Sequence, residues 1–462
     1  MGNFQGFGRD VRVPLKPLTL IFGANASGKS SIIRALLLLR QAAPSRGNFR
    51  GPVGFSFEGP DISLASFANA VHKHDESQRI MVGVSHSSRA ELPSLNPYLM
   101  SMRRIVKSVE TKFFIGSNSK IVGLVLSFSL VNGNSLELNF TEQGGLVKVF
   151  DFFDSGAMDT IATSLPDVEP DNMGADFEEG SEVAAQPYAS NLDLAWEEVF
   201  QQLDFSWFRM SVSPRRESKV PETQLQVVTH LLALARMSLY KELAIINHIG
   251  PLREISARLS FEGENRRQKP LKASSGEAVP PDHEIVSAWL HNLTEGRYSF
   301  EPMEFSAPEV SFLGVLQSQI LIDNLTNTPV TFADVGVGLS QVLPILQALQ
   351  QSEYRPEATI VIEQPELHLH PKMQASLTDL FVSFVNQNPN SQIIAETHSE
   401  AMLLRLERRI REGVLKAEDV EILFVDKDET SNRVTSVDLT SDGDFAQNMP
   451  LSFSSLRLDD LL

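Results

Sequence analysis

The sequence predicts an α/β fold in which a mixed β-sheet is joined to an antiparallel β subdomain and to an inserted lobe that is helical and acidic. Three observations predict it. A glycine-rich loop separates an apolar strand from a helix near the N-terminus, hairpin patterns follow that helix, and apolar strands alternate with amphipathic helices toward the C-terminus. Alternation of strands and helices in this way is typical of a parallel sheet.

The composition is that of a folded protein without disulfides. The chain has 462 residues, of which 42% are hydrophobic, so it can bury one large discontinuous core or two ordinary ones. Cysteine is absent, which excludes disulfides, thiolate metal sites and thiol nucleophiles and suits a reducing compartment. Because the N-terminus lacks a signal-peptide pattern and no apolar run is long enough to span a bilayer, we expect a cytoplasmic protein without membrane insertion.

The charge is unevenly distributed along the chain. The formal net charge is −18, which excludes a surface that is basic throughout and coats nucleic acid. Residues 151–200 contain thirteen Asp or Glu and no Lys or Arg, and we expect a solubilising surface insertion there, with DNA mimicry or partner docking as the alternative. DNA contact elsewhere stays open because three basic clusters remain: Arg103, Arg104 and Lys107; Arg215, Arg216 and Lys219; and Arg266, Arg267, Lys269 and Lys272.

Hydrophobic patterns divide the chain into three expected parts, residues 1–150, 151–247 and 248–462. In the first part, alternating segments separated by glycine turns predict an antiparallel meander over Val122–Val131, Ser135–Phe140 and Leu146–Phe150. The second part ends in a helical pattern from Pro221 to about Asn247. In the third part, strand, helix and strand patterns predict a βαβ unit over Ala358–Ile362, Pro371–Asn386 and Gln392–Ala395.

The first strand leads directly into a complete phosphate-binding pattern. Leu18–Phe22 is followed by Gly23-Ala24-Asn25-Ala26-Ser27-Gly28-Lys29-Ser30, which fits the Walker A form G-x-x-x-x-G-K-[ST] without a mismatch, and then by a helix. Glycines let the backbone close around phosphates, the helix start adds amide donors, and the lysine neutralises the β- and γ-phosphates. We expect ATP to bind here with Ser30 as a Mg²⁺ ligand. The expected binding residues are Gly23, Asn25, Ala26, Ser27, Gly28, Lys29, Ser30 and Ser31.

A carboxylate ends a second apolar strand. Glu363 follows Thr359–Ile362 and is expected to be the Walker B acid, which holds Mg²⁺ directly or through water. The next residue is Gln364, whose amide orients water but is a poor base, so we expect slow hydrolysis unless Glu366 replaces the missing carboxylate. His368 and His370 suggest a zinc or iron site as the alternative to packing within the loop.

Two further segments complete the pattern. Ile393–Glu396 is a strand that leads to His398, an imidazole expected to reach a γ-phosphate or to orient the attacking water. Asp334–Gln341 precedes a helix and forms another anion-binding helix start. Since the chain already has its own phosphate loop, Gly338 and Ser340 are expected to meet the nucleotide of a second subunit, and a simple helix cap is the alternative.

The motif order of Walker A, glycine-serine helix, Walker B and switch histidine resembles the ABC-type ATPase head of SMC, RecF and OLD-type proteins. The stretches GANASGKSS, HIGPLR, DVGVGLSQVLP, EQPELHLHP and ETHSE are more similar to a family of stand-alone bacterial predicted ATPases of unknown function, often encoded near phage-defence and DNA-modification genes. This resemblance covers about residues 1–150 and 248–462. It implies a homodimer that sandwiches ATP and Mg²⁺ and acts as a nucleotide-gated switch, with a separately encoded effector as partner.

Departures from the pattern separate the rival functions. The glycine-serine segment lacks the LSGGQ form and lies roughly 300 residues after the Walker A loop, which disfavours a transporter subunit. Related heads begin with a strand before the position of Asn3-Phe4, so the true start is expected upstream. Asp426-Lys427-Asp428 lies between two apolar strands and is expected to be a hairpin turn, which disfavours a built-in nuclease. The remaining rivals are a RecF-like DNA-repair ATPase and a nucleotide-gated scaffold that hardly hydrolyses.

Overall fold

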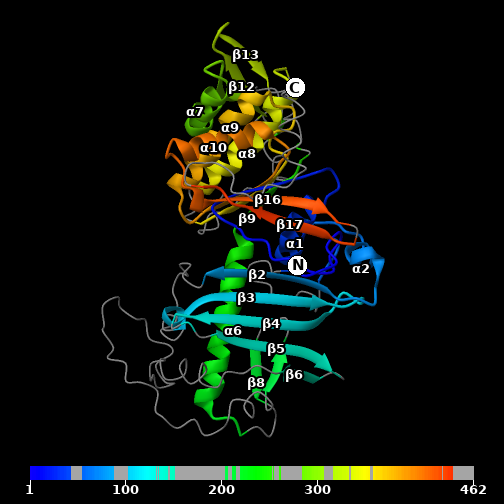
Figure 1. Cartoon of the computed structure of the whole chain (residues 1–462). Helices are drawn as coiled ribbons and strands as arrows, with labels where there is room; N and C mark the ends of the chain where they lie inside the picture. The colour runs from blue at the N-terminus through cyan, green and yellow to red at the C-terminus, as the bar shows by residue number, and fades with distance from the viewer. Residues whose placement is uncertain are drawn as a thin grey trace, which may run out of the picture. The chain divides into compact units, whose positions relative to one another are not determined.

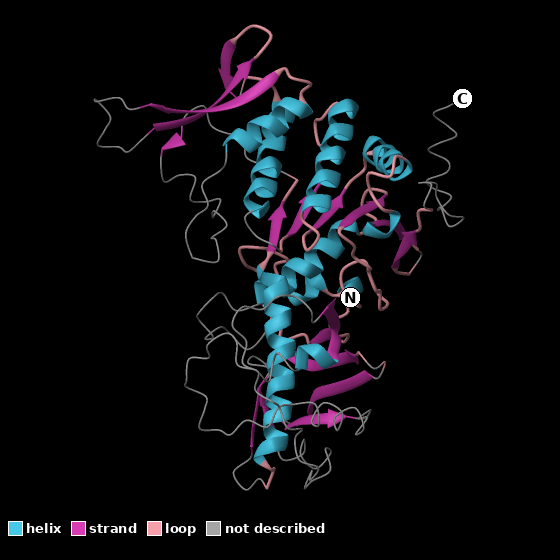
Figure 2. Cartoon of the chain, turned by 90° about the vertical axis from the view of Figure 1, so that its left-hand side faces the viewer, coloured by secondary structure: helices cyan, strands magenta, loops and turns pink. Residues whose placement is uncertain are grey.

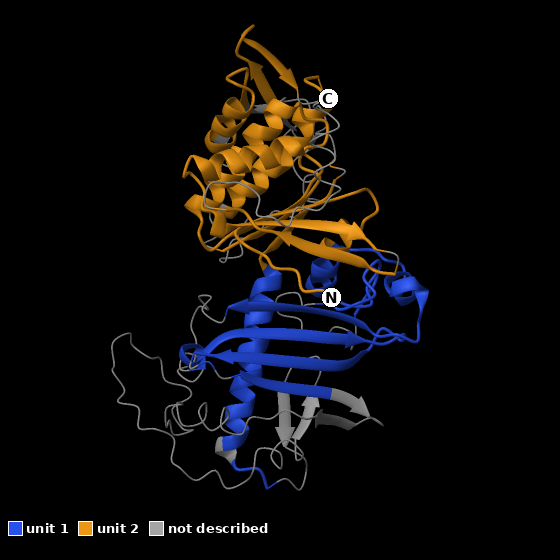
Figure 3. Cartoon of the chain, in the orientation of Figure 1, with its two compact units in different colours: residues 1–10, 34–244 blue, residues 11–33, 245–462 orange. Residues whose placement is uncertain are grey.

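The computed structural model divides the chain into two compact units, each with its own internal packing (Figure 3). Unit 1 comprises residues 1–10 and 34–244, and unit 2 comprises residues 11–33 and 245–462. The expected boundaries at residues 150 and 247 stay a prediction. The described residues are 1–42, 55–87, 102–131, 133, 135–143, 146–150, 203–206, 211–214, 219–251, 253, 260–261, 283–305, 316–331, 334–353, 357–428 and 430–440. The acidic segment 151–200, Arg215, Arg216 and the basic cluster at 266–272 lie outside them.

Unit 1 is an antiparallel meander accompanied by a long helix (Figures 1 and 2). Its five strands pair in chain order: β2 (Ile80–Ser87), β3 (Val106–Ile115), β4 (Ile121–Leu130), β5 (Ser135–Gln143) and β6 (Leu146–Phe150). The expected hairpins are confirmed, because β4 pairs antiparallel with β5 and β5 with β6. Helix α6 (Glu222–Ala244) contacts β2, β3 and β8. The smaller elements are α2 (Phe67–Ala70), η1 (His72–His74), β7 (Leu203–Ser206) and β8 (Ser211–Pro214).

Helix α6 ends three residues before the expected position. The helical pattern suggests a helix to about Asn247, whereas Ile246–Ile249 forms strand β9, which pairs in parallel with β14 (Thr359–Glu363) in unit 2. Sheet pairing here overrides the helical periodicity. Among the described residues, neither α6 nor any other helix has both the length and the apolar character needed to cross a bilayer.

A buried histidine is expected to make the fold of unit 1 sensitive to acid. His86 on β2 is buried, and desolvation lowers its pKa from 6.5 to about 4. The folded protein therefore holds a neutral imidazole, whereas the unfolded chain takes up a proton below pH 6.5. The free energy of unfolding has its full value above pH 6.5. It falls by about 3 kcal/mol as the pH falls from 6.5 to 4, because the unfolded chain binds a proton that folded His86 does not. His86→Leu is expected to flatten this part of the pH profile in urea unfolding, and an unchanged profile would contradict the assignment.

The main sheet of unit 2 has six strands in the order β17-β16-β1-β15-β14-β9, and all neighbours are parallel except β16 and β17. The strands not yet given are β1 (Leu18–Gly23), β15 (Gln392–Glu396), β16 (Val420–Lys427) and β17 (Asn432–Val437). The expected βαβ unit is confirmed, since α9 (Pro371–Gln387) connects β14 to β15. The other helices are α8 (Val337–Glu353), α10 (Glu400–Arg411) and η5 (Ala417–Asp419); α1 (Lys29–Ala42) begins in unit 2.

Apolar side chains from the strands and helices of unit 2 form its core, which includes Leu18, Leu20, Leu343, Ile360 and Phe381. A second sheet in this unit contains β10 (Ser260–Phe261), β11 (Tyr298–Phe305), β12 (Leu316–Asp323) and β13 (Thr328–Thr331). Helix α7 (His283–Leu293) contacts β11, α8 and α9. The mixed α/β fold expected from the sequence is confirmed, with a mainly parallel sheet in unit 2 and separate antiparallel sheets in both units.

Candidate functional site

The ends of three adjacent parallel strands bring the predicted motifs together at one edge of the main sheet of unit 2. β15 lies between β1 and β14, so the Walker A loop, Glu363 and the segment leading to His398 follow neighbouring strands. Their register places Glu396 beside both Ile21 and Glu363. Parallel strands end at the same edge of a sheet, which is where ligands bind in open α/β folds. The motif residues are separated by hundreds of positions in sequence but meet here.

The Walker A loop is built from backbone conformations that favour glycine. Gly23 and Gly28 have φ values of 148° and 100°, and a Cβ on Gly23 would lie 2.3 Å from the carbonyl oxygen of Val425. Ala26 also has a positive φ, and both it and Asn25 are exposed. Ser27 and Ser31 are buried, and the Ser27 hydroxyl makes no hydrogen bond to any described residue.

Lys29 is folded back onto its own loop. Its Nζ donates to the carbonyl oxygens of Gly23 at 3.0 Å and Ala24 at 2.9 Å, and the side chain is only 4% exposed. Desolvation lowers the pKa of Lys29, while the negative charges of Glu396 and Glu366 oppose this shift. A buried ammonium that is satisfied only by loop carbonyls can exchange these contacts for phosphate oxygens.

Glu396, to which none of the sequence motifs gives a role, contacts the Walker A helix. Ser30 Oγ donates to Glu396 Oε1 at 3.1 Å, and the carboxylate is 4% exposed. The signal was present in the sequence, since Glu396 is a charged residue that directly follows the apolar run Ile393–Ala395. Its significance depends on the strand order, which places β15 directly beside the Walker A strand.

The carboxylate of Glu363 contacts His248, which is another site residue that the sequence motifs did not predict. His248 Nε2, on β9, lies 2.8 Å from Glu363 Oε1. With a proton on Nε2 the imidazole donates to the carboxylate and fixes its orientation. His248 belongs to the stretch HIGPLR, but only the pairing of β9 with β14 brings the two side chains together.

Arg253 connects the Walker B turn to helix α8. This arginine is buried, and its Nη2 donates to the carbonyl oxygens of Glu363 at 2.7 Å and Gln364 at 3.3 Å. On the other side, Nη1 donates to the carbonyl of Gln341 on α8, and the Gln341 side chain accepts from Arg253 N–H and donates to Arg253 C=O. Desolvation lowers the pKa of Arg253 to about 10, so the guanidinium stays charged at neutral pH. Hydrogen bonds of Arg253 therefore connect Gln341 on α8 to the backbone of Gln364.

The backbone of Gln364 is constrained in addition to its contact with Arg253. Gln364 has a φ of 47°, and its N–H donates to the carbonyl of Glu396 at 2.7 Å. A glutamine in the left-handed region is uncommon and is held here by hydrogen bonds on both sides of the residue. The amide is thus presented from a defined turn directly after Glu363.

Glu366 organises the segment that carries His398. Its Oε2 accepts from the Thr397 hydroxyl at 2.7 Å, and its Oε1 accepts from the His398 N–H at 2.7 Å. The His398 side chain is exposed, but its pKa is lowered by partial desolvation and then by the positive charge of Lys29, against the opposing effect of Glu366. The lowered pKa favours the neutral form of the His398 imidazole.

The glycine-serine segment does not present Ser340 to solvent. α8 starts at Val337, and Ser340, three residues into the helix, is 1% exposed and donates to the Gly336 carbonyl at 3.4 Å. A Cβ on Gly338 would lie 2.5 Å from the carbonyl oxygen of His368, so this glycine allows α8 to approach the Walker B loop closely. The exposed residues at the helix start are Asp334, Gly336 and Val337. The role of Gly338 and Ser340 toward a second nucleotide stays a prediction.

The donor set at the sheet edge fits Mg²⁺. Ser30, Glu363 and Glu396 offer only oxygen atoms, the ligands that Mg²⁺ prefers. Within the described residues no group of three or more His, Cys, Asp or Glu side chains could hold a metal by itself, so phosphate and water would have to supply the other ligands. His370 caps α9 by accepting from the Lys372 N–H, and His368 is exposed.

The expected turn at Asp426-Lys427-Asp428 is confirmed only in part, because Asp426 and Lys427 belong to β16 and Asp428 alone lies in the β16–β17 turn. β16 and β17 pair antiparallel, and the Asp428 N–H donates to the carbonyl of Ser431 within the turn. Desolvation raises the pKa of Asp426. This arrangement is that of a turn between two paired strands.

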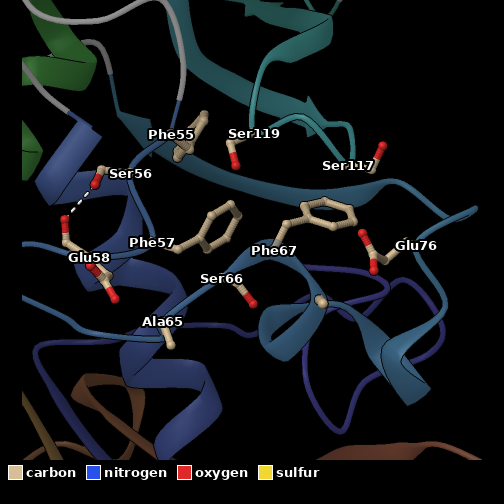
Figure 4. A pocket seen from close by; sticks show the side chains of 11 residues that line it. Phe55, Ser56, Phe57, Glu58, Ala65, Ser66, Phe67, Glu76, Ser117 and Ser119 are labelled. Atoms are coloured by element: carbon tan, nitrogen blue, oxygen red, sulfur yellow. Dashed lines mark hydrogen bonds between the residues drawn. The ribbon is translucent and has the colours of Figure 1, made fainter.

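An open cavity of about 630 Å³ lies in unit 1 and contains none of the motif residues (Figure 4). Figure 4 shows the rings of Phe57 and Phe67 beside it, with the carboxylates of Glu58 and Glu76 at its margins. The described residues that line it include no lysine or arginine, so they do not offer the cations that a phosphate group requires.

Two family models and several solved structures match the chain. Residues 283–403 match the family described as AAA ATPase domain, and residues 1–127 match the family described as AAA domain. The Smc head domain of Pyrococcus furiosus with an extended coiled coil, bound to the C-terminal domain of ScpA, is similar at 12% identity over 99% of this chain and 98% of that chain, with a TM-score of 0.41.

Two further Smc head domains give similar values. The head domain of Pyrococcus yayanosii with a coiled coil and joint is 11% identical over 99% of this chain and 98% of that chain, with a TM-score of 0.41. The SMC head domain of Thermotoga maritima is 11% identical over 95% of this chain and 97% of that chain, with a TM-score of 0.34.

Proposed function

We propose that this chain, a P-loop ATPase of the ABC/SMC-like type, binds ATP with Mg²⁺, hydrolyses it slowly, and acts as a nucleotide-gated homodimeric switch. The observation that supports this most strongly is the meeting of Lys29, Glu363 and His398 at the ends of three adjacent parallel strands. We further propose that the switch controls a separately encoded effector in phage defence or DNA maintenance. That last step rests on the family resemblance of the five motif stretches.

Each residue in the site has a proposed task. The amides at the start of α1 and the Lys29 ammonium bind the phosphates, while Ser30 and Glu363 hold Mg²⁺, with His248 fixing the Glu363 carboxylate. Bound Mg²⁺ neutralises part of the charge on the β- and γ-phosphates. Gln364 and His398 orient the attacking water, and Glu366 keeps the His398 segment in place.

Dimerisation is proposed to occur through the start of α8. A helix N-terminus carries partial positive charge and presents amide donors, which suit the γ-phosphate bound by a second copy of the chain. Val337 is 45% exposed at this start, whereas Ser340 is buried. A substitution at Ser340 would therefore disturb the core, and Val337 is the better position for a test.

Val337→Glu is expected to leave ATP binding intact and to abolish ATP-dependent dimerisation, because a carboxylate at the helix start repels the phosphate of the other subunit. Light scattering with and without MgATP measures the mass of each variant. Val414→Glu is the matched control, since Val414 is 48% exposed in the same unit. If Val337→Glu dimerises with ATP as the wild type does, the proposed role of the α8 start is wrong.

The two rival functions predict different kinetics. A RecF-like repair ATPase is expected to hydrolyse ATP faster when DNA is added, and the described basic cluster at Arg103, Arg104 and Lys107 is the first place to neutralise. A scaffold that hardly hydrolyses is expected to dimerise with ATP but to show no steady-state turnover above background.

A further inference from the structure

We propose that Glu396 is a second carboxylate of the metal site and makes tight ATP binding depend on a divalent cation. The inference rests on the proposed function, because it concerns the same nucleotide site. It assigns a role to a residue that lies one position after the apolar part of β15 and outside the predicted site.

One hydrogen bond and one register pairing place Glu396 where the metal is expected. Its Oε1 accepts from Ser30 Oγ at 3.1 Å, and Ser30 is the hydroxyl proposed to bind Mg²⁺. Its register partner on β14 is Glu363, so the two residues are neighbours across adjacent parallel strands, about 4.8 Å apart at the backbone. Register partners of parallel strands point to the same face, and both carboxylates therefore border one space with the hydroxyl.

The negative charge of Glu396 is expected to weaken the binding of metal-free ATP and to strengthen the binding of MgATP. Glu396 is 4% exposed, and its charge acts on Lys29, whose pKa it helps to raise against desolvation. A carboxylate with so little water around it repels the polyphosphate of metal-free ATP strongly, since burial weakens dielectric screening. A divalent cation between carboxylate and phosphate converts this repulsion into attraction.

A purely structural role for Glu396 predicts a different result. If its hydrogen bond to Ser30 serves only to hold the first turn of α1, loss of the carboxylate charge should weaken ATP binding equally with and without metal. A role in the metal site predicts opposite changes in the two conditions. The comparison of metal-bound and metal-free affinity thus separates the two roles without any measurement of hydrolysis.

The test measures ATP binding to the full chain by calorimetry, once with Mg²⁺ and once with EDTA, for wild type and Glu396→Gln. In EDTA, Glu396→Gln is expected to bind ATP about tenfold more tightly than wild type, and in Mg²⁺ about tenfold more weakly. Glu421→Gln is the matched control: Glu421 is also 4% exposed, lies on β16 of the same sheet, and pairs instead with Lys16 at 3.1 Å. Its metal dependence is expected to equal that of wild type.

The outcomes separate this inference from the proposed function. If wild type binds ATP equally well in Mg²⁺ and EDTA, or if Glu396→Gln weakens binding by the same factor in both, the role in the metal site is overturned while ATP binding stands. If wild type binds ATP in neither condition, the proposed function itself fails. Thermal unfolding of both variants shows whether they are folded, and equal affinity of the wild type in Mg²⁺ and EDTA would overturn the inference even if Glu396→Gln does not fold.

Discussion

Lys29→Ala is expected to weaken MgATP binding by at least about a hundredfold, which corresponds to about 3 kcal/mol. The substitution removes the cation that exchanges two loop carbonyls, those of Gly23 and Ala24, for phosphate oxygens. The backbone amides of the loop are expected to bind the phosphates still. The negatively charged triphosphate then lies near the carboxylates of Glu363 and Glu396 without the positive charge of the lysine. Calorimetry with MgATP measures the loss directly.

Lys16→Ala is the matched control for this prediction. Lys16 is in the same unit and also contacts a backbone carbonyl, that of Val420 at 2.8 Å, but it pairs with Glu421 near the opposite end of β1. The control is expected to bind MgATP as the wild type does. An unchanged affinity of Lys29→Ala, with Lys16→Ala also unchanged, would refute the assignment of the Walker A loop.

Local patterns in the sequence were sufficient for the motifs and for most strands near them. The Walker A loop and the strand ends at Glu363 and His398 were predictable because each depends on a short segment: an apolar run, a glycine turn and a helix start. The meander was predictable for the same reason, since glycine turns separate its alternating segments.

Features that depend on which strands become neighbours were not predictable. His248, Arg253 and Glu396 reach the site only because β9 and β15 flank β14, and strand order is set by packing of the whole sheet. The burial of Ser340 likewise depends on where α8 begins and which face it turns to the core. The position at which a helix is expected to start in the sequence does not tell which of its first residues face the core.

Gln364→Glu is expected to raise the steady-state ATPase rate by a factor of about 10² or more. A carboxylate accepts a proton from the attacking water, and general-base catalysis is typically worth about 10²–10⁴. The backbone of Gln364 is fixed by hydrogen bonds to Glu396 and Arg253. We therefore expect the substitution to change the chemistry of the side chain and to leave the backbone conformation unchanged. Gln387→Glu, at an exposed position at the end of α9, adds the same charge and is expected to leave the rate unchanged.

Glu366 is the alternative base, and its contacts decide how it must be tested. Both oxygens of its carboxylate accept hydrogen bonds, from Thr397 and His398, so Glu366→Gln places an amide donor against one of these donors and disturbs the His398 segment. A loss of activity in Glu366→Gln alone therefore does not identify a base.

Thr397→Val removes one of the two hydrogen bonds to Glu366 but leaves the Glu366 charge in place. If Glu366 only positions the segment, Thr397→Val is expected to lower the rate about as much as Glu366→Gln does; if Glu366 is the base, Thr397→Val keeps most of the activity. A wild-type enzyme that turns over rapidly and is insensitive to Gln364→Glu, Glu366→Gln and Thr397→Val would contradict both assignments.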